Sequence, residues 1–252
     1  AAGIYHRPVA GFNKDSPERD IGKRCELAFG YQGGVGAWRN FEKFATKNYV
    51  PFTDEKIKET KDLWRGNHPK IKQYWYDLQE ASIAAVKNEG KIYRAGAPGR
   101  FVRFKKAGSF LWLLLPSGRA LCYAYPQIRL GQYGSLLTYK TVPSVDDFKK
   151  GLIIDDSGNS KQWARIGTYG GKLSENITQA ICRDLLVDAM LRLEAAGYSI
   201  VTHVHDEIVV EGIFPPHNLE VVNNIMNSIP IWAKDFPLVA KCWLNKRYLK
   251  GD

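Results

Sequence analysis

The period of the hydrophobic pattern changes along the chain, and this change limits the possible folds more than any other feature of the sequence. Before about residue 100, apolar residues recur at the spacing of amphipathic helices. From Phe101 onward, the chain breaks into short runs rich in β-branched and aromatic residues, which is typical of strands. Helices and strands that are segregated in this way indicate an α+β fold.

Three helical segments are predicted in the first third of the chain. The sequence Asp-Ser-Pro-Glu at residues 15–18 offers an N-cap, a proline for the first turn and an early acid. We therefore expect a helix from there to the glycine pair at residues 33–34. Two more helical patterns cover residues 54–65 and 69–88, with a Gly-Asn break between them.

Strands and one long helix are predicted in the middle of the chain. The runs FVRF, SFLWLLLP and RALCYAYP lie within residues 101–126, and the turn at residues 116–118 predicts a hairpin between the last two. A loop is expected over residues 145–161. A long amphipathic helix should cover residues 174–196 and end at Gly197. Its expected buried stripe consists of Ile177, Ile181, Leu185, Ala189 and Leu193.

The last part of the chain is predicted to contain a hairpin with a charged tip. Residues 198–204 and 208–211 have the composition of strands, and residues 205–207, His-Asp-Glu, lie between them. A helix over residues 218–227 and a closing strand over residues 238–244 are expected to follow.

The composition indicates the environment and one class of partner. The 252 residues include 36 Lys and Arg against 26 Asp and Glu, a net charge of +10, which suggests a polyanionic partner or, alternatively, a solvated basic surface. The apolar runs are far shorter than the ~20 residues of a membrane span. Residues 1–15 lack the features of a signal peptide. The four cysteines form no CxxC pair, so we expect them to be reduced thiols. Together, these features predict a cytoplasmic protein that does not enter a membrane.

A row of side chains in the first predicted helix could bind a nucleotide. Arg19, Lys23, Leu27 and Tyr31 lie four residues apart and share one helix face. Two cations suit the phosphates, the apolar residue suits a sugar, and an aromatic ring suits a base. The alternative is a surface helix with solvated cations and a tyrosine in the core.

The long helix carries a second polar row, opposite its apolar stripe. Glu175, Gln179 and Arg183 form this row, and Asn176 lies beside it. Amide and guanidinium groups meet base and sugar acceptors in the minor groove of a nucleic-acid duplex. A solvated helix face is the alternative.

The predicted hairpin tip joins two adjacent carboxylates, Asp206 and Glu207. Such a pair could hold magnesium through oxygen ligands, or it could lie on an exposed turn. A third possibility is a transition-metal site made by His203, His205 and Asp206, because imidazoles two residues apart share a strand face.

Taken in order, these segments resemble the family A DNA polymerases, and above all the forms found in bacteriophages and prophages. Arg19-x3-Lys23-x7-Tyr31 resembles motif B of the fingers, and FGYQGGVGAW resembles its phage form. YGGKLSENITQ resembles the start of the palm helix that touches the primer-template minor groove. VHDE, at residues 204–207, resembles palm motif C, and PLVAKCWLNKRYLK is similar to the phage C-terminal strand.

The resemblance implies a role for each matching residue. Arg19 and Lys23 would hold the triphosphate of the incoming dNTP, and Tyr31 would lie at the template-base or stacking position. Leu27 stands where the family usually has an aromatic residue that packs against the sugar. The roles implied for the other matching residues are duplex contact for Gln179 and Asn176, metal coordination for Asp206, and catalysis for Asp206, Glu207 and His205.

The resemblance also implies a fold, a reaction and partners. Helical fingers at residues 1–67 would precede an antiparallel-sheet palm at residues 68–252, as part of a polymerase right hand. The reaction would be nucleotidyl transfer to a primer 3′-hydroxyl with two magnesium ions, and the substrates would be primer-template DNA and dNTP.

The upstream motif A of the family, which carries the second metal-binding aspartate, is not found in the eighteen residues before Arg19. We therefore expect a C-terminal portion that is inactive alone and needs a partner, the remainder of the polymerase. The alternatives are a noncatalytic nucleic-acid-binding module that keeps the polymerase shape and, more distantly, a metal-dependent hydrolase.

Overall fold

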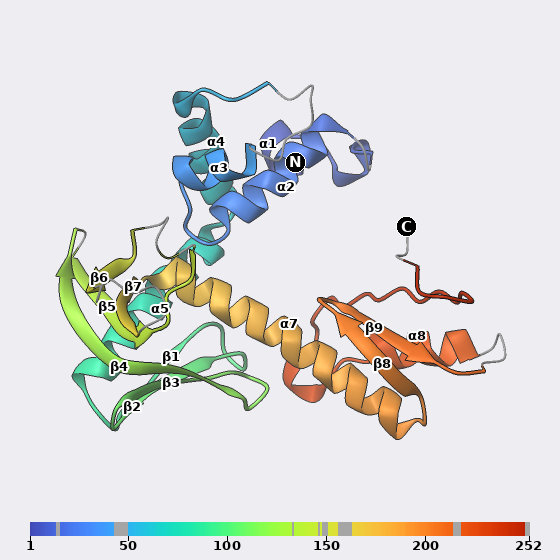
Figure 1. The fold of residues 1–252 in the computed structure, drawn as a ribbon. Helices are drawn as coiled ribbons and strands as arrows, with labels where there is room; N and C mark the ends of the chain where they lie inside the picture. Colours follow the sequence, from blue (N-terminus) through green and yellow to red (C-terminus); the bar gives the residue numbers. More distant parts are fainter. Residues whose placement is uncertain are drawn as a thin grey trace. The chain divides into compact units, whose positions relative to one another are not determined.

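The chain folds into two compact units. The first contains Ala1–Leu114 and Ala120–Asn176, and the second contains Leu115–Arg119 and Ile177–Asp252. A computed structural model describes residues 1–13, 16–42, 50–132, 134–145, 147, 151–155, 163–213 and 218–249, and Figure 1 labels their helices and strands. The predicted boundary between fingers and palm, after residue 67, falls inside the first unit and stays a prediction.

Helices open the first unit, as the hydrophobic period predicted. They are α1 (Ala2–Tyr5), the 3-10 turn η1 (Val9–Gly11), α2 (Pro17–Phe29), α3 (Val35–Glu42), α4 (Asp54–Asn67) and α5 (Pro69–Lys87). The Ser16 hydroxyl accepts a hydrogen bond from the Arg19 amide at 3.2 Å, and the Thr53 hydroxyl accepts one from the Lys56 amide at 3.2 Å. These caps satisfy amides that have no partner within the helix.

The first long helix is shorter than predicted. It ends at Phe29 instead of the glycine pair at residues 33–34, because Gln32 takes a left-handed backbone conformation with a φ of 66° and turns the chain into α3. The break between α4 and α5 lies at His68, one residue after the predicted Gly-Asn pair.

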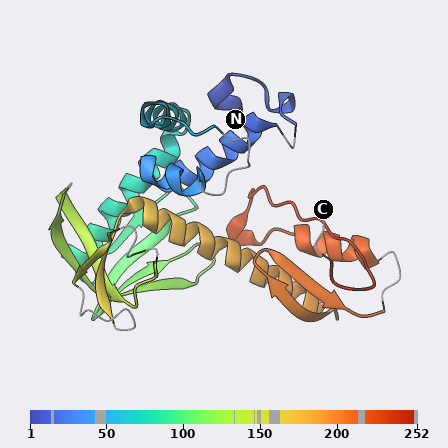
Figure 2. The same cartoon turned by 45° about the horizontal axis from the view of Figure 1, so that its top comes forward.

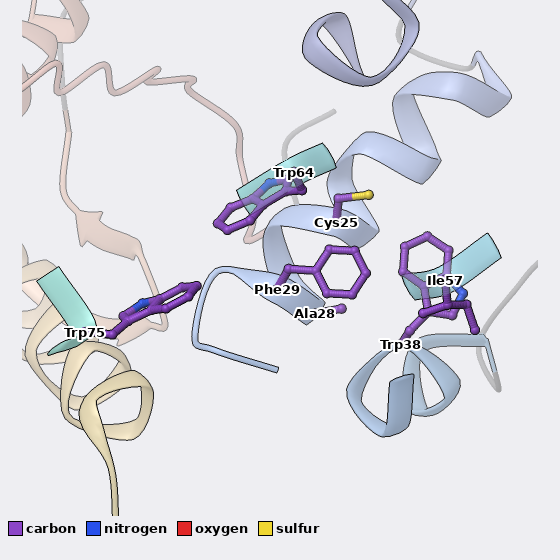
Figure 3. Close-up of a cluster of buried hydrophobic side chains, with 7 residues drawn as sticks. All are labelled: Cys25, Ala28, Phe29, Trp38, Ile57, Trp64 and Trp75. Atoms are coloured by element: carbon purple, nitrogen blue, oxygen red, sulfur yellow. The ribbon is translucent and has the colours of Figure 1, made fainter. Parts of the chain in front are cut away.

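Aromatic residues form the core of the helical part, shown in Figure 3. The buried cluster consists of Cys25, Ala28, Phe29, Trp38, Ile57, Trp64 and Trp75. The Trp38 ring stacks on Phe29 with a centroid separation of 5.5 Å, and Trp64 stacks on Trp75 at 6.3 Å. Because α2 contributes Cys25, Ala28 and Phe29 to this core, its opposite face must meet solvent.

An antiparallel sheet of seven strands completes the first unit. Its strands are β1 (Ile92–Ala95), β2 (Val102–Ala107), β3 (Phe110–Leu114), β4 (Ala120–Gly131), β5 (Gly134–Thr141), β6 (Ile153–Asp155) and β7 (Ala164–Thr168). They are ordered β1-β2-β3-β4-β5-β7-β6. The predicted hairpin between β3 and β4 is confirmed, with Leu114 opposite Ala120. The sequence did not predict β1, β5, β6 or β7.

The sheet curls around α5, as Figures 1 and 2 show. This helix contacts each of the strands from β1 to β5. Strand β6 lies inside the segment 145–161 that was predicted as a loop, so that prediction is wrong at Ile153–Asp155. The remainder of the predicted loop is described at residues 145, 147, 151 and 152, while 146, 148–150 and 156–161 lie outside the described residues.

The long helix α7 (Gly170–Ala195) continues from the first unit into the second. It begins at Gly170 instead of residue 174, and Gly197, with a φ of 85°, follows its end as predicted. Four members of the predicted stripe are buried, and Ile181 is half-buried. The second unit adds β8 (Ser199–Val204), β9 (Glu207–Glu211), α8 (Asn218–Asn227) and the 3-10 turn η2 (Ile231–Ala233).

The closing strand predicted over residues 238–244 is not formed. The side-chain amide of Asn227, at the end of α8, forms hydrogen bonds with both the amide and the carbonyl of Ala240. Its Nδ2 donates to the Ala240 carbonyl at 3.0 Å, and its Oδ1 accepts from the Ala240 amide at 2.7 Å. A side chain therefore satisfies the backbone that a neighbouring strand would have satisfied.

The predicted α+β class is confirmed, since helices are followed by antiparallel sheets in the order that the hydrophobic period indicated. Among the helices of the described ranges, none combines the length and the apolar character needed to cross a membrane.

Candidate functional site

The helix α2 presents the predicted nucleotide row on its outer face. Arg19, Lys23 and Leu27 are exposed, and Leu27 keeps 46% of its surface accessible. Tyr31 is half-buried and lies two residues beyond the end of α2, after Gly30, which keeps a helical backbone conformation. The aromatic core fixes the opposite face of the helix, so the row projects from a rigid element.

Hydrogen bonds from two long side chains hold the turn after α2. The Trp75 indole Nε1 donates to the Gly30 carbonyl at 3.1 Å. Arg65 Nη2 donates to the carbonyls of Gln32 and Gly33 at 3.3 and 2.9 Å. Backbone carbonyls in a turn need partners from outside a helix or sheet ladder, so these donors stabilise the turn that carries Tyr31.

The start of α7 packs directly against this turn. The Gly171 amide donates to Gln32 Oε1 at 2.9 Å. A Cβ on Gly171 would lie 2.3 Å from the Tyr31 carbonyl oxygen, and a Cβ on Gly170 would lie 1.8 Å from the Trp75 carbonyl oxygen. Both positions therefore require glycine. Two of the motifs recognised in the sequence, FGYQGG and YGGK, meet in space at this contact.

Sequence reasoning missed Gln32 as a positioning residue. The feature of the sequence that could have indicated this role is the position of Gln32 inside FGYQGG, between Tyr31 and the glycine pair. Nothing in the periodicity could show that its side chain reaches the amide of a residue so distant in the chain.

The candidate duplex-binding residues lie on α7 in different environments. Asn176 is half-buried, and its Nδ2 donates to the Tyr123 hydroxyl at 3.1 Å. Burial raises the pKa of Tyr123 to about 12, although this hydrogen bond acts to lower it. Gln179 is exposed. Asn176 is thus hydrogen-bonded to the sheet, whereas Gln179 lies on the surface.

The acidic tip is a tight turn, and it is smaller than predicted. Val204 pairs with Glu207, so Glu207 is the first residue of β9 and not part of the tip. His205 has a φ of 53° and Asp206 is exposed. The Tyr248 hydroxyl donates to Glu207 Oε2 at 3.2 Å. Because the Asp206 carboxylate meets solvent, it does not need the buried positive partner that two desolvated acids would require.

Residues of α7 approach this hairpin within the second unit. Arg183 Nη2 lies 3.4 Å from His203 Nε2. The pKa of the Cys182 thiol is raised, first by partial desolvation and then by the negative charge of Asp206. Arg183, which was predicted only as part of a polar row, therefore contacts the strand that leads into the tip.

No group of three or more His, Cys, Asp and Glu side chains within the described ranges could hold a metal ion. The transition-metal site considered for His203, His205 and Asp206 is therefore wrong. Magnesium makes a smaller demand on the protein, since it keeps several waters and takes one or two carboxylates together with substrate phosphates. The exposed carboxylate of Asp206 fits one such ligand, and a further carboxylate would have to come from elsewhere.

Comparison with known proteins agrees with the motifs. The chain is 36% identical over 251 residues to a protein named DNA polymerase from Bacillus phage SP02. This similarity confirms the resemblance to phage DNA polymerases. It spans 99% of the present chain but only 35% of the phage protein, so the chain spans about a third of that relative's length. No protein-family model and no solved structure matches the chain.

Proposed function

We propose that this chain is the fingers and second palm portion of a family A DNA polymerase that acts in the cytoplasm. The main support for this proposal is the similarity to a phage DNA polymerase along 99% of the chain. It is supported by the exposed row of Arg19, Lys23 and Leu27 on a rigid helix. A solvated surface helix has no need of the glycine contacts that fix the turn at Tyr31.

The proposed reaction is template-directed nucleotidyl transfer. The primer 3′-oxygen forms a bond to the α-phosphorus of a dNTP, and the bond from that phosphorus to the oxygen of the departing pyrophosphate breaks. Magnesium, when bound, neutralises the charge that develops on the phosphate oxygens and activates the primer hydroxyl. Asp206 is the proposed ligand for it, and the second carboxylate is proposed to come from the part of the polymerase that carries motif A, which lies outside the present sequence.

The other candidate residues bind and orient the substrates in this proposal. The guanidinium of Arg19 and the ammonium of Lys23 bind the triphosphate, Leu27 contacts the sugar, and Tyr31 stacks against a base. Gln179 and Asn176 contact the primer-template duplex. Glu207 orients the hairpin through its hydrogen bond with Tyr248, and His205 lies near the primer terminus.

Reconstitution tests the proposal. The chain alone should show no appreciable primer extension, and extension should begin when a polypeptide that carries motif A is added. Asp206→Ala should abolish it almost completely. Glu211→Ala, which removes an exposed acid at the far end of β9, the strand that follows Asp206, should have no effect. A well-folded complex that stays inactive would overturn the proposal.

The dNTP row has its own matched pair of variants. Lys23→Ala removes a charge-assisted phosphate contact and should raise the dNTP KM of the reconstituted enzyme by roughly 10- to 100-fold. Lys58→Ala removes an exposed cation of α4 and should leave KM unchanged. Equal KM values for the two variants would remove Lys23 from the substrate site.

The alternative function is a noncatalytic nucleic-acid-binding module, and the net charge of +10 favours it. Such a module binds DNA with an affinity that falls steeply with salt. Extension in a reconstituted assay would then be indifferent to Asp206→Ala, which separates this reading from the polymerase.

A further inference from the structure

The sheet of the first unit has one face against α5 and another in solvent. Along β2 and β3, buried and exposed residues alternate. The buried members of this alternation are Val102, Phe104, Leu111 and Leu113. The exposed members are Arg103, Lys105, Phe110 and Trp112. Because successive side chains of a strand point to opposite faces, the exposed set lies on the outer face.

Aromatic rings gather on this outer face. Phe110, Trp112 and Tyr125 keep 37%, 40% and 51% of their surface accessible. The Phe110 ring centroid lies 5.6 Å from that of Trp112 and 6.5 Å from that of Tyr125. Large rings of this kind are usually buried, so a contiguous exposed set of three indicates a binding surface.

The backbone holds Tyr125 in this set at a conformational cost. Its φ is 49°, which is unfavourable for an aromatic residue, and it lies within a register shift of β4 between Ala124 and Gln127. Its amide donates to the Ser109 carbonyl at 2.7 Å, and Arg165 Nη1 donates to its carbonyl at 2.9 Å. A strained conformation fixed from both sides is typical of a functional site.

Positive charge surrounds the rings. The strands β1 to β5 contain no Asp or Glu, and their cations include Arg94, Arg103, Lys105 and Lys140. Lys106 alternates to the other face of β2 and pairs with Glu89 at 2.6 Å. Arg94 and Arg103 lie directly opposite each other, and Lys105 lies opposite Trp112. The Lys140 ammonium lies 6.0 Å from the Tyr125 ring centroid. Like charges that face each other across strands are unfavourable unless an anion binds them.

We propose that the outer face of β1–β4 binds single-stranded DNA. Bases would stack on Phe110, Trp112 and Tyr125, while the phosphate backbone would follow Arg103 and Lys105. Aromatic rings interleaved with cations on a sheet are the means by which proteins bind single strands without sequence preference. An apolar protein partner would cover the rings but would leave the facing arginines unneutralised. The inference does not depend on nucleotidyl transfer by this chain.

Fluorescence anisotropy with a labelled oligothymidine of about 16 nucleotides tests the stacking contacts. Trp112→Ala should weaken binding roughly tenfold or more, whereas Trp112→Phe should retain most of the affinity. The control is Tyr76→Ala, which removes a ring of α5 that is 49% exposed and should change nothing. Equal affinities of the wild-type chain and Trp112→Ala would overturn the proposal, and circular dichroism verifies folding of each variant.

The charges are tested by the salt dependence of the same binding. The double variant Arg103→Ala, Lys105→Ala should reduce the slope of log affinity against log salt by roughly 0.7 for each lost phosphate contact. Lys58→Ala should leave the slope unchanged. An unchanged slope in the double variant would contradict the proposed path of the backbone.

The wild-type chain offers a measurement without any substitution. Cys122 is exposed on β4 directly opposite Trp112, and Cys182 is exposed on α7. Oligothymidine should protect Cys122 from alkylation and leave Cys182 reactive. Protection of Cys182 alone, or of neither thiol, would overturn the inference. Asp206→Ala should leave this protection intact, so a failure of primer extension and a failure of single-strand binding are distinguished.

Discussion

Gly171→Ala tests how tightly the turn that carries Tyr31 is built against α7. An added Cβ would lie 2.3 Å from the Tyr31 carbonyl oxygen and 2.4 Å from Gln32 Cβ. The first of these contacts is with backbone, which cannot rotate away. Either α7 or the turn must shift, and the hydrogen bond from the Gly171 amide to Gln32 Oε1 must lengthen.

The expected cost combines three effects. Overpacking typically costs about 1–3 kcal/mol, and loss of the hydrogen bond costs about 0.5–1.5 kcal/mol. Alanine in place of glycine within a helix returns about 1 kcal/mol. The net destabilisation is therefore about 0.5–3.5 kcal/mol, and the middle of this range lowers the Tm by roughly 6 °C for a unit of this size.

Urea unfolding followed by tryptophan fluorescence measures this effect, because Trp38, Trp64 and Trp75 lie in the core of the same unit. The matched control is Gly66→Ala. Gly66 is also helical, with nothing within 4 Å of an added Cβ, so the substitution should stabilise the chain by about 0.5–1 kcal/mol. If both variants were stabilised alike, the close packing between the turn and α7 would be refuted.

Three further predictions concern stability and its dependence on pH. Trp38→Ala should cost about 3–5 kcal/mol in urea unfolding, since it empties a fully buried site in the aromatic core. Burial raises the pKa of Tyr74 from 10.0 to about 12. As the pH rises, the unfolded chain therefore loses this proton before the folded chain does. Stability that is present below pH 10 is lost as the pH rises toward about 12. Tyr74→Phe should make the urea midpoint fall less steeply with pH over this window. Asp184→Ala should cost about 1–3 kcal/mol by thermal unfolding, because the carboxylate accepts from Ser117 Oγ and Arg119 Nε at 2.5 Å each; a Tm equal to that of the wild-type chain would show that these bonds contribute nothing.

Local signals determined the helices. Ser16 before Pro17 and Thr53 before Asp54 mark helix starts in any context, because their hydroxyls satisfy amides of the same segment. The boundaries of α8 were predicted in full, and Gly197 was identified as the residue that ends the long helix. Such signals act over one or two helical turns and need no information from the rest of the chain.

Several strands depended on partners that are distant in the sequence. The strands β1, β5, β6 and β7 were not predicted from their local pattern, and their backbone groups are satisfied by neighbouring strands of the sheet. Conversely, residues 238–244 have the composition of a strand, yet Asn227 takes the backbone groups of Ala240. Pairing partners decide such cases, and composition does not.

The sequence by itself determined the helical first third, the order of the motifs, the excess of positive charge and the resemblance to phage DNA polymerases. Only the tertiary structure decided that FGYQGG meets YGGK through Gln32, that Glu207 belongs to β9, and that three aromatic rings share the outer face of the sheet. The physical reason is the sequence separation over which each feature forms. Helix caps and hydrophobic periods depend on residues a few positions apart. Close backbone approach, strand register and an exposed face exist only after distant segments have packed together.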